Sequence, residues 1–500
     1  MNDDLLLFLQ AWTGGAEVSA AERERLLARL KDDEAFRSAC HEEIRLLGML
    51  HAAQNSTPPR PDLQAALTAL GPTPSAQPTD RNPQISFRQL AAIAASLILI
   101  IGGGFWWHDS QQVIATVVND TGAQNLSNGT SIRKGFHRFE AGVVELMTSR
   151  GARLTIEAPA EFRFEDAQRL HLTKGRLSAE VPPFAKGFTV ITPSGQAVDL
   201  GTRFGVDVPA TGPAEVHVFQ GEVVAKAAGE GRTLSLRDGK AVTMEKGVSV
   251  ERELRSSAFI HASELNGLSA GLSAGQRARA EAAIAALWRD PSLIALLDFR
   301  SGEPQPGVYR TVQGRWPGSR AAEFVDVGDH LKLDVGGDRA WPQLTLAAWV
   351  RLDRLGAPYQ SLLHTDGWNK GNPGQVHWMI TQLTTMRLAL YANTLQQGSD
   401  ELNGYPDSRT SVRPEQGRWL HLATVYDADR KTVRFYLNGQ FDKESRQEVA
   451  YPARLGKAQV GNWDRQDRKL SGRVDELLLL GRAMPDAEIR ALYEAGNPYR

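Results

Sequence analysis

The feature that most constrains this chain is an uncharged apolar stretch well inside it, residues 90–107 (LAAIAASLILIIGGGFWW). Its length is close to the ~20 residues that an α-helix needs to cross the hydrocarbon core of a bilayer. The stretch lies too far from residue 1 to be a secretory signal peptide, which occupies the first ~15–30 residues. We therefore expect one transmembrane helix over residues 90–107, the alternative being a buried helix of a soluble fold.

Basic residues flank this stretch on one side. Arg81 and Arg88 precede it, whereas the first Lys or Arg after it is Arg133. Because basic flanks remain in the cytoplasm, the N-terminal part should lie inside and the large C-terminal part outside. The expected location is the inner (cytoplasmic) membrane, crossed once, with the N-terminus cytoplasmic and the C-terminal domains periplasmic.

Composition excludes two classes of partner and site. The formal net charge of the 500 residues is −1, so electrostatics do not draw the chain to nucleic acid, and we expect no nucleic-acid partner. The single cysteine, Cys40, excludes a zinc site with paired cysteine ligands. A chain of this length predicts about three domains.

Residues 1–70 have a helical pattern, with apolar side chains every three or four positions and charges between them. Ser19 followed by Glu22 predicts a capping box at a helix start. A proline-rich tether, residues 71–89, follows. A segment of this length can bury only a small hydrophobic core. We therefore expect one helix face to bind a partner protein, the alternative being a self-contained helical bundle. The candidate partner face consists of Leu26, Leu30, Phe36, Ile44 and Leu47.

Over residues 110–250 the pattern changes to short alternating or β-branched runs separated by Gly, Pro or Asp. Strands at ~8–12-residue spacing predict an all-β domain and leave open a sandwich, a barrel or a solenoid. The segment FTVITPSGQAVDLGTRFGVDV (residues 188–208), followed by EVHVFQGEVVA, resembles the core signature of FecR-type domains. The upstream SRGARLTIEAPAEFRFEDAQRLHLTKGRLSAEVPP matches the rest of that family's pattern.

The FecR resemblance implies a membrane-anchored regulator. In such a protein the inner helices bind an extracytoplasmic-function sigma factor, and the outer domain receives a signal. This chain lacks the His-x3-Cys-x2-Cys zinc motif that many anti-sigma proteins carry. Within the signature, Gly201 is expected to permit a bend or a close approach in a strand.

A connector, residues 251–290, is expected to hold one helix over residues 274–288, and strand patterns return over residues 291–500. Asn438-Gly439 predicts a two-residue hairpin turn. LTLAAWVR, WLHLATVYDADRKTVRFYLNGQ and SGRVDELLLLGRAMPDAEIRALYEAG together resemble LamG-like, concanavalin A-type jelly rolls. The resemblance implies two packed antiparallel sheets and a closing helix over residues 486–494.

Jelly rolls of this type bind glycans or proteins, and some hold calcium, so the resemblance implies the same classes of ligand here. The aromatic candidates for stacking on a sugar ring are Trp368, Trp378, Tyr391 and Trp463, with core packing as the alternative for each. Asp366 and Asp464 are candidate calcium ligands, although calcium takes six to eight oxygens. No other cofactor is expected.

We expect no catalysis. Glucanases of related fold need paired carboxylates for acid–base chemistry, and on one strand such a pair appears as Glu-x-Asp-x-x-Glu. This sequence contains no such run. Asp475 and Glu476 are adjacent, so in a strand they should point to opposite faces. Two Gly-x-Ser-x-Gly matches, around Ser269 and Ser273, lie in a small-residue connector and lack the strand–turn–helix context of a nucleophile elbow.

The sequence as a whole predicts a multidomain chain with a small all-α N-terminal domain, one transmembrane helix, an all-β FecR domain and an all-β jelly-roll sandwich. The expected function is a single-pass membrane signal-transducing regulator of the FecR type, an anti-sigma or sigma-regulating protein whose outer jelly roll binds a glycan or an envelope protein. The alternative is a cell-envelope adhesion or carbohydrate-binding scaffold without sigma-factor regulation.

Overall fold

The computed structural model describes Asp4, Leu7, Phe8, residues 19–40 and residues 112–499, apart from 230–232, 246, 300–304, 369–371 and 398–403. The chain divides into two compact units, Met1–Ile98 and Leu99–Arg500. The proline-rich tether expected over residues 71–89 lies outside the described residues.

The structure corrects the expected fold class in one respect, the transmembrane helix. Helix α2 (Ala20–Asp32) has 13 residues, α6 (Ala262–Ser273) and α7 (Gln276–Leu287) have 12 each and α8 (Asp486–Gly496) has 11, whereas a span needs ~20. Among the residues that the structure describes, no helix is long and apolar enough to cross a membrane. Residues 90–107, on which the expectation was based, lie outside the described ranges.

The first unit contains helix α2 (Ala20–Asp32), and residues 34–40 are also helical. The predicted capping box is present, because the backbone N–H of Ser19 donates to Glu22 Oε2 at 3.0 Å and the Ser19 hydroxyl accepts from the Glu22 N–H. The capping box satisfies two backbone donors that a helix start otherwise leaves unpaired. Asp33 ends this helix in an extended conformation.

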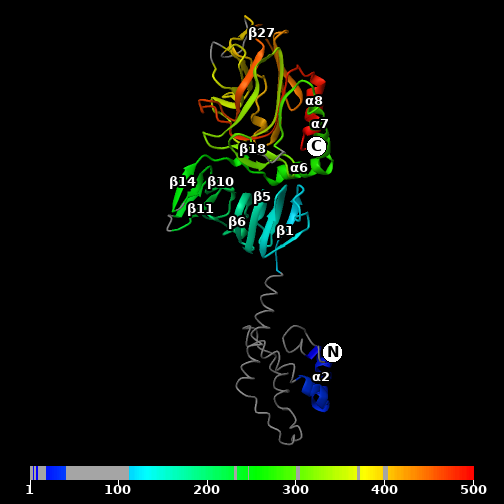
Figure 1. Cartoon of the computed structure of the whole chain (residues 1–500). Coiled ribbons are helices and arrows are strands. Elements are labelled where there is room, and N and C mark those ends of the chain that lie inside the picture. The colour runs from blue at the N-terminus through cyan, green and yellow to red at the C-terminus, as the bar shows by residue number, and fades with distance from the viewer. Residues whose placement is uncertain are drawn as a thin grey trace, which may run out of the picture. The chain divides into compact units, whose positions relative to one another are not determined.

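The second unit begins with an all-β region that we call the first β domain, residues 112–252 (Figure 1). Its strands join in one 14-stranded sheet, in the order β12-β11-β8-β7-β6-β5-β4-β1-β2 with β9, β10, β13, β14 and β3 attached beside this path. Their bounds are β1 (Val113–Asp120), β2 (Ser131–Arg133), β3 (Gly135–Phe139), β4 (Val143–Thr148), β5 (Arg153–Asp166), β6 (Arg169–Glu180), β7 (Thr189–Thr192), β8 (Gly195–Asp199), β9 (Arg203–Val208), β10 (Ala214–Gln220), β11 (Glu222–Ala227), β12 (Thr233–Arg237), β13 (Ala241–Glu245) and β14 (Val248–Arg252).

Strand β6 joins two arms of the first β domain. Its residues 169–171 pair in parallel with β7, and its residues 175–180 pair antiparallel with β9. Val223 of one arm and Val242 of the other belong to the same hydrophobic core. The two arms therefore enclose one core, which favours a sandwich-like arrangement among the three that the sequence left open.

The connector holds two helices, α6 (Ala262–Ser273) and α7 (Gln276–Leu287), where the sequence predicted one over residues 274–288. Gly275, at φ 77°, ends the first helix and begins the second. The run GLSAGLSAG, which we interpreted as connector, lies mostly within α6 because Leu265 and Leu268 are buried against Val143 and Ile260. This burial outweighs the low helix propensity of glycine.

The second β domain, residues 291–499, is the two-sheet sandwich that the resemblance implied (Figure 1). One sheet has nine strands in the order β17-β18-β29-β20-β25-β26-β27-β24 with β15 beside β29, and the other has six in the order β16-β19-β28-β21-β22-β23. The bounds are β15 (Leu293–Leu297), β16 (Gly307–Val308), β17 (Arg310–Gln313), β18 (Arg320–Phe324), β19 (His330–Trp341), β20 (Gln343–Leu352), β21 (Tyr359–Thr365), β22 (Val376–Thr381), β23 (Met386–Leu390), β24 (Thr394–Leu395), β25 (Trp419–Asp427), β26 (Thr432–Leu437), β27 (Gln440–Val449), β28 (Ala453–Val460), β29 (Gly472–Leu480) and helix α8 (Asp486–Gly496).

Two local predictions in this domain are confirmed. Asn438 and Gly439 have φ of 49° and 71° and form the two-residue turn between β26 and β27, where Leu437 pairs with Gln440. Both positive φ angles are typical of a type I′ turn, which matches the twist of the flanking strands. The closing helix is α8, two residues longer than expected.

Candidate functional site

The three described members of the candidate partner face lie inside the first unit. Leu26, Leu30 and Phe36 are buried, and the Phe36 ring contacts the Phe8 ring with centroids 6.4 Å apart. Ile44 and Leu47 lie outside the described residues. The described part of this face therefore forms a small core, and partner binding through it would need that core to open.

The aromatic candidates of the second β domain divide between the two faces of the six-stranded sheet. Trp378 lies in the core, fully buried, and its indole N–H donates to Thr424 Oγ1 at 2.9 Å. It is therefore a packing residue and is not accessible to a ligand. Because side chains alternate along β22, the neighbouring His377 lies on the opposite, outer face. The other three candidates, Trp368, Tyr391 and Trp463, lie together around this histidine.

Trp368 lies flat over His377, with ring centroids 3.9 Å apart and an interplanar angle of 29°. Tyr391 and Tyr405 meet the Trp368 ring edge-on, at 5.2 Å and 6.4 Å between centroids. These three rings are half-buried, so each keeps some accessible surface. Trp463 borders His377 at 5.1 Å but is only 3% exposed, so it supports the site and offers little surface to a ligand.

Arg468 holds this cluster together from the loop after β28. Its Nη1 donates to His364 Nε2 at 2.9 Å and to His377 Nδ1 at 3.0 Å. Its guanidinium lies over the Trp463 ring at 4.1 Å and over the Tyr359 ring at 5.0 Å. We call Tyr359, His364, Trp368, His377, Tyr391, Tyr405, Trp463 and Arg468 the outer-face cluster.

Both histidines of the outer-face cluster are neutral acceptors at neutral pH. Burial and the nearby Arg468 lower the pKa of His377 to about 3 and hold the pKa of His364 well below its ordinary value. Each accepts from Arg468 with one ring nitrogen, and the other nitrogen contacts Ser361 Oγ at 2.6 Å in His364 and the Thr365 carbonyl at 3.2 Å in His377. These contacts fix the ring orientations.

The candidate calcium ligands lie near one another, and each accepts a hydrogen bond. Asp366 Oδ1 accepts from Gln459 Nε2, and Asp464 Oδ2 accepts from the Gly367 N–H, both at 3.1 Å. Burial raises the pKa of Asp366, and the charge of Asp464 adds to this effect. Within the described ranges, no group of three or more His, Cys, Asp or Glu side chains could hold a metal ion.

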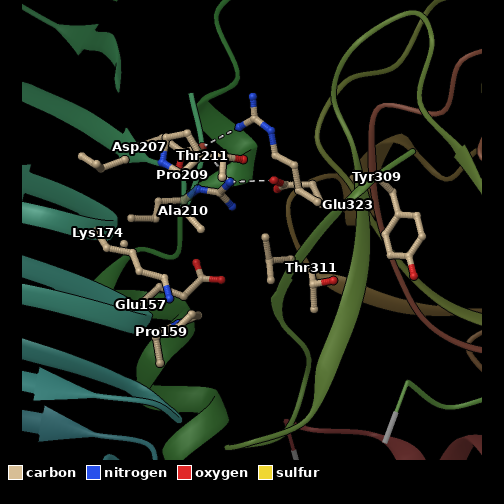
Figure 2. Close-up of a pocket in the computed structure, with 16 residues that line it drawn as sticks. Glu157, Pro159, Lys174, Asp207, Pro209, Ala210, Thr211, Tyr309, Thr311 and Glu323 are labelled. Atoms are coloured by element: carbon tan, nitrogen blue, oxygen red, sulfur yellow. Dashed lines mark hydrogen bonds and ion pairs between the residues drawn. The ribbon is translucent and has the colours of Figure 1, made fainter. Parts of the chain in front are cut away.

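A second feature lies where the two β domains meet, a cavity of about 280 Å³. Figure 2 shows Glu157, Lys174 and Asp207 of the first β domain on one side of it, and Thr311 and Glu323 of the second on the other. The charged side chains beside this cavity form ion pairs that water hardly reaches, because the side chains of Arg176, Glu323 and Arg473 are at most 6% exposed.

These ion pairs connect the two β domains directly. Arg176 Nη2 donates to Asp207 of its own domain at 2.8 Å and to Glu323 of the other at 2.9 Å. Arg473 crosses in the opposite direction and pairs with Glu157 through Nη1. Burial acts to raise the pKa of Glu323, but Arg176, Arg473 and Arg255 together hold it below its usual range, so the carboxylate stays ionised.

The same arginines hold the start of the connector between the domains. The carbonyl of Ala258 accepts from Arg176 Nη1 at 3.2 Å and from Arg473 Nη2 at 2.9 Å. Arg351, fully buried on β20, donates to the carbonyls of Ser257 and Phe259 at 3.1 Å each. Residues 257–259 are therefore fixed from both sides, and we call these contacts, with the ion pairs above, the domain junction.

Asp475 and Glu476 differ from the sequence prediction, because they do not face opposite ways. Arg315 contacts both, at 3.7 Å to Asp475 Oδ1 and 2.6 Å to Glu476 Oε1. The cause is a register shift between β20 and β29, in which Trp349 pairs with Glu476 and Val350 with Val474, so Asp475 is the extra residue of a bulge. The guanidinium of Arg315 pairs with Glu476, and Asp475 accepts from the backbone N–H of Arg315 at 2.5 Å.

Comparison with known families identifies the two β domains. Residues 139–224 match the family model described as FecR protein, and residues 326–490 match the model described as Concanavalin A-like lectin/glucanases superfamily. Both resemblances stated from the sequence are therefore confirmed, and together they support a regulatory or binding role. No curated protein matches the chain in sequence.

Several solved structures resemble part of the chain. A putative carbohydrate binding protein from Bacteroides ovatus has 14% identity over 34% of this chain and a TM-score of 0.26; the chain spans 46% of that structure. The CBM40 of the IT-sialidase of Ruminococcus gnavus, bound to alpha2,3 sialyllactose, has 19% identity over 32% of this chain and 95% of its own, with a TM-score of 0.25. Domain 4 of AbnA, a GH43 extracellular arabinanase from Geobacillus stearothermophilus in complex with arabinotriose, has 18% identity over 40% of this chain and 86% of its own, with a TM-score of 0.28. Scores of this size do not identify a ligand.

Sequence reasoning missed Tyr359, His364, His377, Tyr405 and Arg468. Two of these had a detectable signal, since His364 and His377 are titratable residues within strands that are otherwise rich in apolar residues. Arg468 and Tyr405 come from loops, and the sequence pattern does not place loops against a sheet.

Proposed function

We propose that this chain is a ligand-sensing regulator of the FecR type. Its second β domain binds the ligand, its first β domain relays the bound state, and its N-terminal helices bind an extracytoplasmic-function sigma factor. The observation that carries the proposal is the domain junction, whose buried ion pairs couple the two β domains. A ligand shifts an equilibrium only through its different affinities for two states, so a sensor needs such coupling between ligand site and output.

The proposed ligand is a glycan, bound on the outer-face cluster by stacking on Trp368 and its two tyrosines. Accessible aromatic faces beside fixed polar groups are typical of sites that orient a small polar ligand. The match to the concanavalin A-like lectin model supports the same class of ligand. An envelope protein is the other ligand class that we expect from the sequence.

We propose binding without catalysis. Asp475 and Glu476 are the adjacent carboxylates that most resemble a catalytic pair, and Arg315 engages both. Turnover of a polysaccharide by the full chain would contradict this part of the proposal. We also propose that both β domains act outside the cytoplasm. Protease treatment of whole spheroplasts tests this, because it should remove the C-terminal domains.

The sigma-factor step is tested by co-purification of the full chain with each extracytoplasmic-function sigma factor of the same cell. We expect one of them to be retained, and its release or retention to change when ligand is added. A chain with Trp368→Ala is the control, since it should retain the sigma factor and lose the response to ligand. Retention of none of the sigma factors would remove this step.

One observation favours the alternative function, an envelope scaffold without sigma-factor regulation. Leu26, Leu30 and Phe36 are buried within the first unit, so the described part of the candidate partner face is already covered. A scaffold would bind glycan with the same outer-face cluster and leave the transcription of sigma-dependent genes unchanged. A reporter for those genes, measured with and without the chain, separates the two functions.

A further inference from the structure

Arg468 differs from the other arginines that this domain draws into its interior. Arg387 forms a two-pronged pair with Asp407, Nε to Oδ1 at 2.5 Å and Nη2 to Oδ2 at 2.7 Å. Arg473 pairs with Glu157, and Arg351 with Glu264. Each of these buried cations therefore has a carboxylate within hydrogen-bond distance.

Among the described residues, the carboxylate nearest to Arg468 is that of Asp467, 4.0 Å from Nε, which is beyond hydrogen-bond distance. The Arg468 side chain is only 20% exposed. Its two hydrogen bonds go to the neutral histidines, and both are made by Nη1. Burial lowers the pKa of Arg468, because the lost hydration of its charge is not fully replaced by nearby negative groups.

The free edge of this guanidinium is accessible. Nε and Nη2 of Arg468 donate no hydrogen bond to any residue that the structure describes, and neither is among the buried atoms that lack a partner. Nε and Nη2 form one edge of the planar guanidinium, the same edge with which Arg387 holds the two oxygens of Asp407. That edge fits a carboxylate in a two-pronged pair.

An aromatic platform lies beside the guanidinium. Trp368 stacks on the face of His377 at 3.9 Å, and Arg468 donates to the Nδ1 of the same ring at 3.0 Å. The indole and the guanidinium therefore adjoin one imidazole. A ligand with its ring on Trp368 and a charged group on Arg468 would therefore contact two side chains that adjoin the same imidazole.

We propose that the outer-face cluster binds acidic saccharides, with the carboxylate of a uronic-acid-type sugar on Nε and Nη2 of Arg468 and its ring on Trp368. This inference deepens the proposed glycan function and depends on it. Arg465 is exposed and lies over the Trp463 ring at 4.9 Å, outside the contacts proposed for the ligand. Asp464, also exposed, is placed to accept from sugar hydroxyls and disfavours a second carboxylate there.

The alternative is that Arg468 has only a structural role and fastens its loop to the sheet, since its own carbonyl also accepts from the Ser361 N–H at 2.8 Å. Both roles predict a loss of stability when Arg468 is replaced. Only the ligand role predicts a change in preference between charged and uncharged forms of one sugar. The experiment therefore compares a saccharide acid with its own methyl ester.

Calorimetric titration of the full chain with oligogalacturonate, oligomannuronate and hyaluronan oligosaccharides, each as acid and as methyl ester, tests the inference. For at least one saccharide we expect the acid to bind about tenfold or more tightly than the ester, because a charge-assisted pair is lost on esterification. Arg468→Gln should reduce this preference to about twofold or less while ester binding is retained, which shows that the site is still folded. Trp368→Ala should weaken acid and ester alike.

Arg465→Gln is the matched control and should keep most of the preference for acids, because its side chain is exposed, where water and salt screen its charge, and it contacts Trp463 and not the proposed ligand. Esters that bind the wild-type chain as well as the acids, or an Arg468→Gln chain that keeps the preference, would overturn the inference and leave the glycan function standing. A wild-type chain that binds none of the acids overturns it also, and binding to an array of neutral glycans then decides whether the glycan function survives.

Discussion

Single residues at the domain junction carry charges that water hardly reaches. Glu157 and Arg473 are 316 positions apart in sequence, and their side chains are 4% and 1% exposed. Attraction inside a protein compensates for the lost hydration of both charges only while both partners are present. Stability should therefore respond much more strongly to loss of one partner here than at the surface.

Arg473→Gln should lower the free energy of unfolding by about 3–5 kcal/mol, because it leaves Glu157 buried with its charge unpaired. Adding Glu157→Gln should restore part of the loss. Denaturant titration measures both. The exposed pair Arg237–Glu222, at 3.6 Å, supplies the control, and Arg237→Gln should cost under about 0.5 kcal/mol. An equal loss of unfolding free energy for Arg473→Gln and Arg237→Gln would contradict the prediction that the buried pair contributes more to stability than the exposed one.

Asp475 predicts a dependence of stability on pH. Burial raises its pKa to about 6, whereas the usual value is 3.8, so the folded chain holds this proton more tightly than the unfolded chain. As pH rises from about 4 to about 6, Asp475 ionises in the unfolded chain while the folded chain still holds the proton, so the folded state loses stability relative to the unfolded one. Over that range Asp475→Asn should gain stability relative to wild type. Denaturation curves at pH 4, 5 and 6 measure the difference, and a gap that stays constant or narrows would contradict the prediction.

At the scale of elements, alternation and turn signals sufficed to predict strands, the hairpin at Asn438 and the closing helix. These elements could be predicted because their formation depends on residues within the same short segment. The helix α6 was missed because its stability comes from Leu265 and Leu268 packing on distant residues. The outer-face cluster shows the same difference, because the sequence suggested Trp368, Tyr391 and Trp463 by residue type, whereas Arg468 joins them only through the fold of its loop. Whether the cluster binds a ligand stays a prediction.

The glycines of the FecR signature show the difference between local and tertiary requirements. Gly201 has φ 98° and an added Cβ would meet nothing within 4 Å, so it serves a turn. Gly205 lies in β9 directly under Phe259 of the connector, and an added Cβ would lie 2.5 Å from that ring.

Gly205→Ala should destabilise the chain by about 1–3 kcal/mol through overpacking, and Phe259→Leu should relieve part of the cost by making space. Gly201→Ala should cost about 1 kcal/mol through backbone strain, with no relief from Phe259→Leu. Denaturant titration of each glycine variant, alone and combined with Phe259→Leu, measures the two losses of unfolding free energy. Relief of both glycine variants by Phe259→Leu would show that the two requirements are not distinct.

For the second unit as a whole, the domain junction makes the two β domains one thermodynamic body. Ion pairs and connector contacts cross between them at Arg176, Arg473 and Arg351, so neither domain can unfold without exposing unpaired charges of the other. No local pattern in the sequence predicts this, because the pairs join residues about 150 and 316 positions apart. The consequence is that heat should unfold both domains in a single calorimetric transition.

Ligand binding should then stabilise that whole transition and not the second β domain alone. A ligand that binds only the folded state adds RT ln(1 + [L]/Kd), about 2.7 kcal/mol at a hundredfold excess over Kd. In the wild-type chain, a saccharide bound at Trp368 should therefore raise the unfolding temperature of both β domains together. In Arg473→Gln, where the junction is weakened, the transition should divide and the ligand should raise only the part that belongs to the second domain. Two separate transitions in the wild-type chain, with only one of them shifted by ligand, would mean that the junction does not relay the bound state, and sensing would need another route to the N-terminal helices.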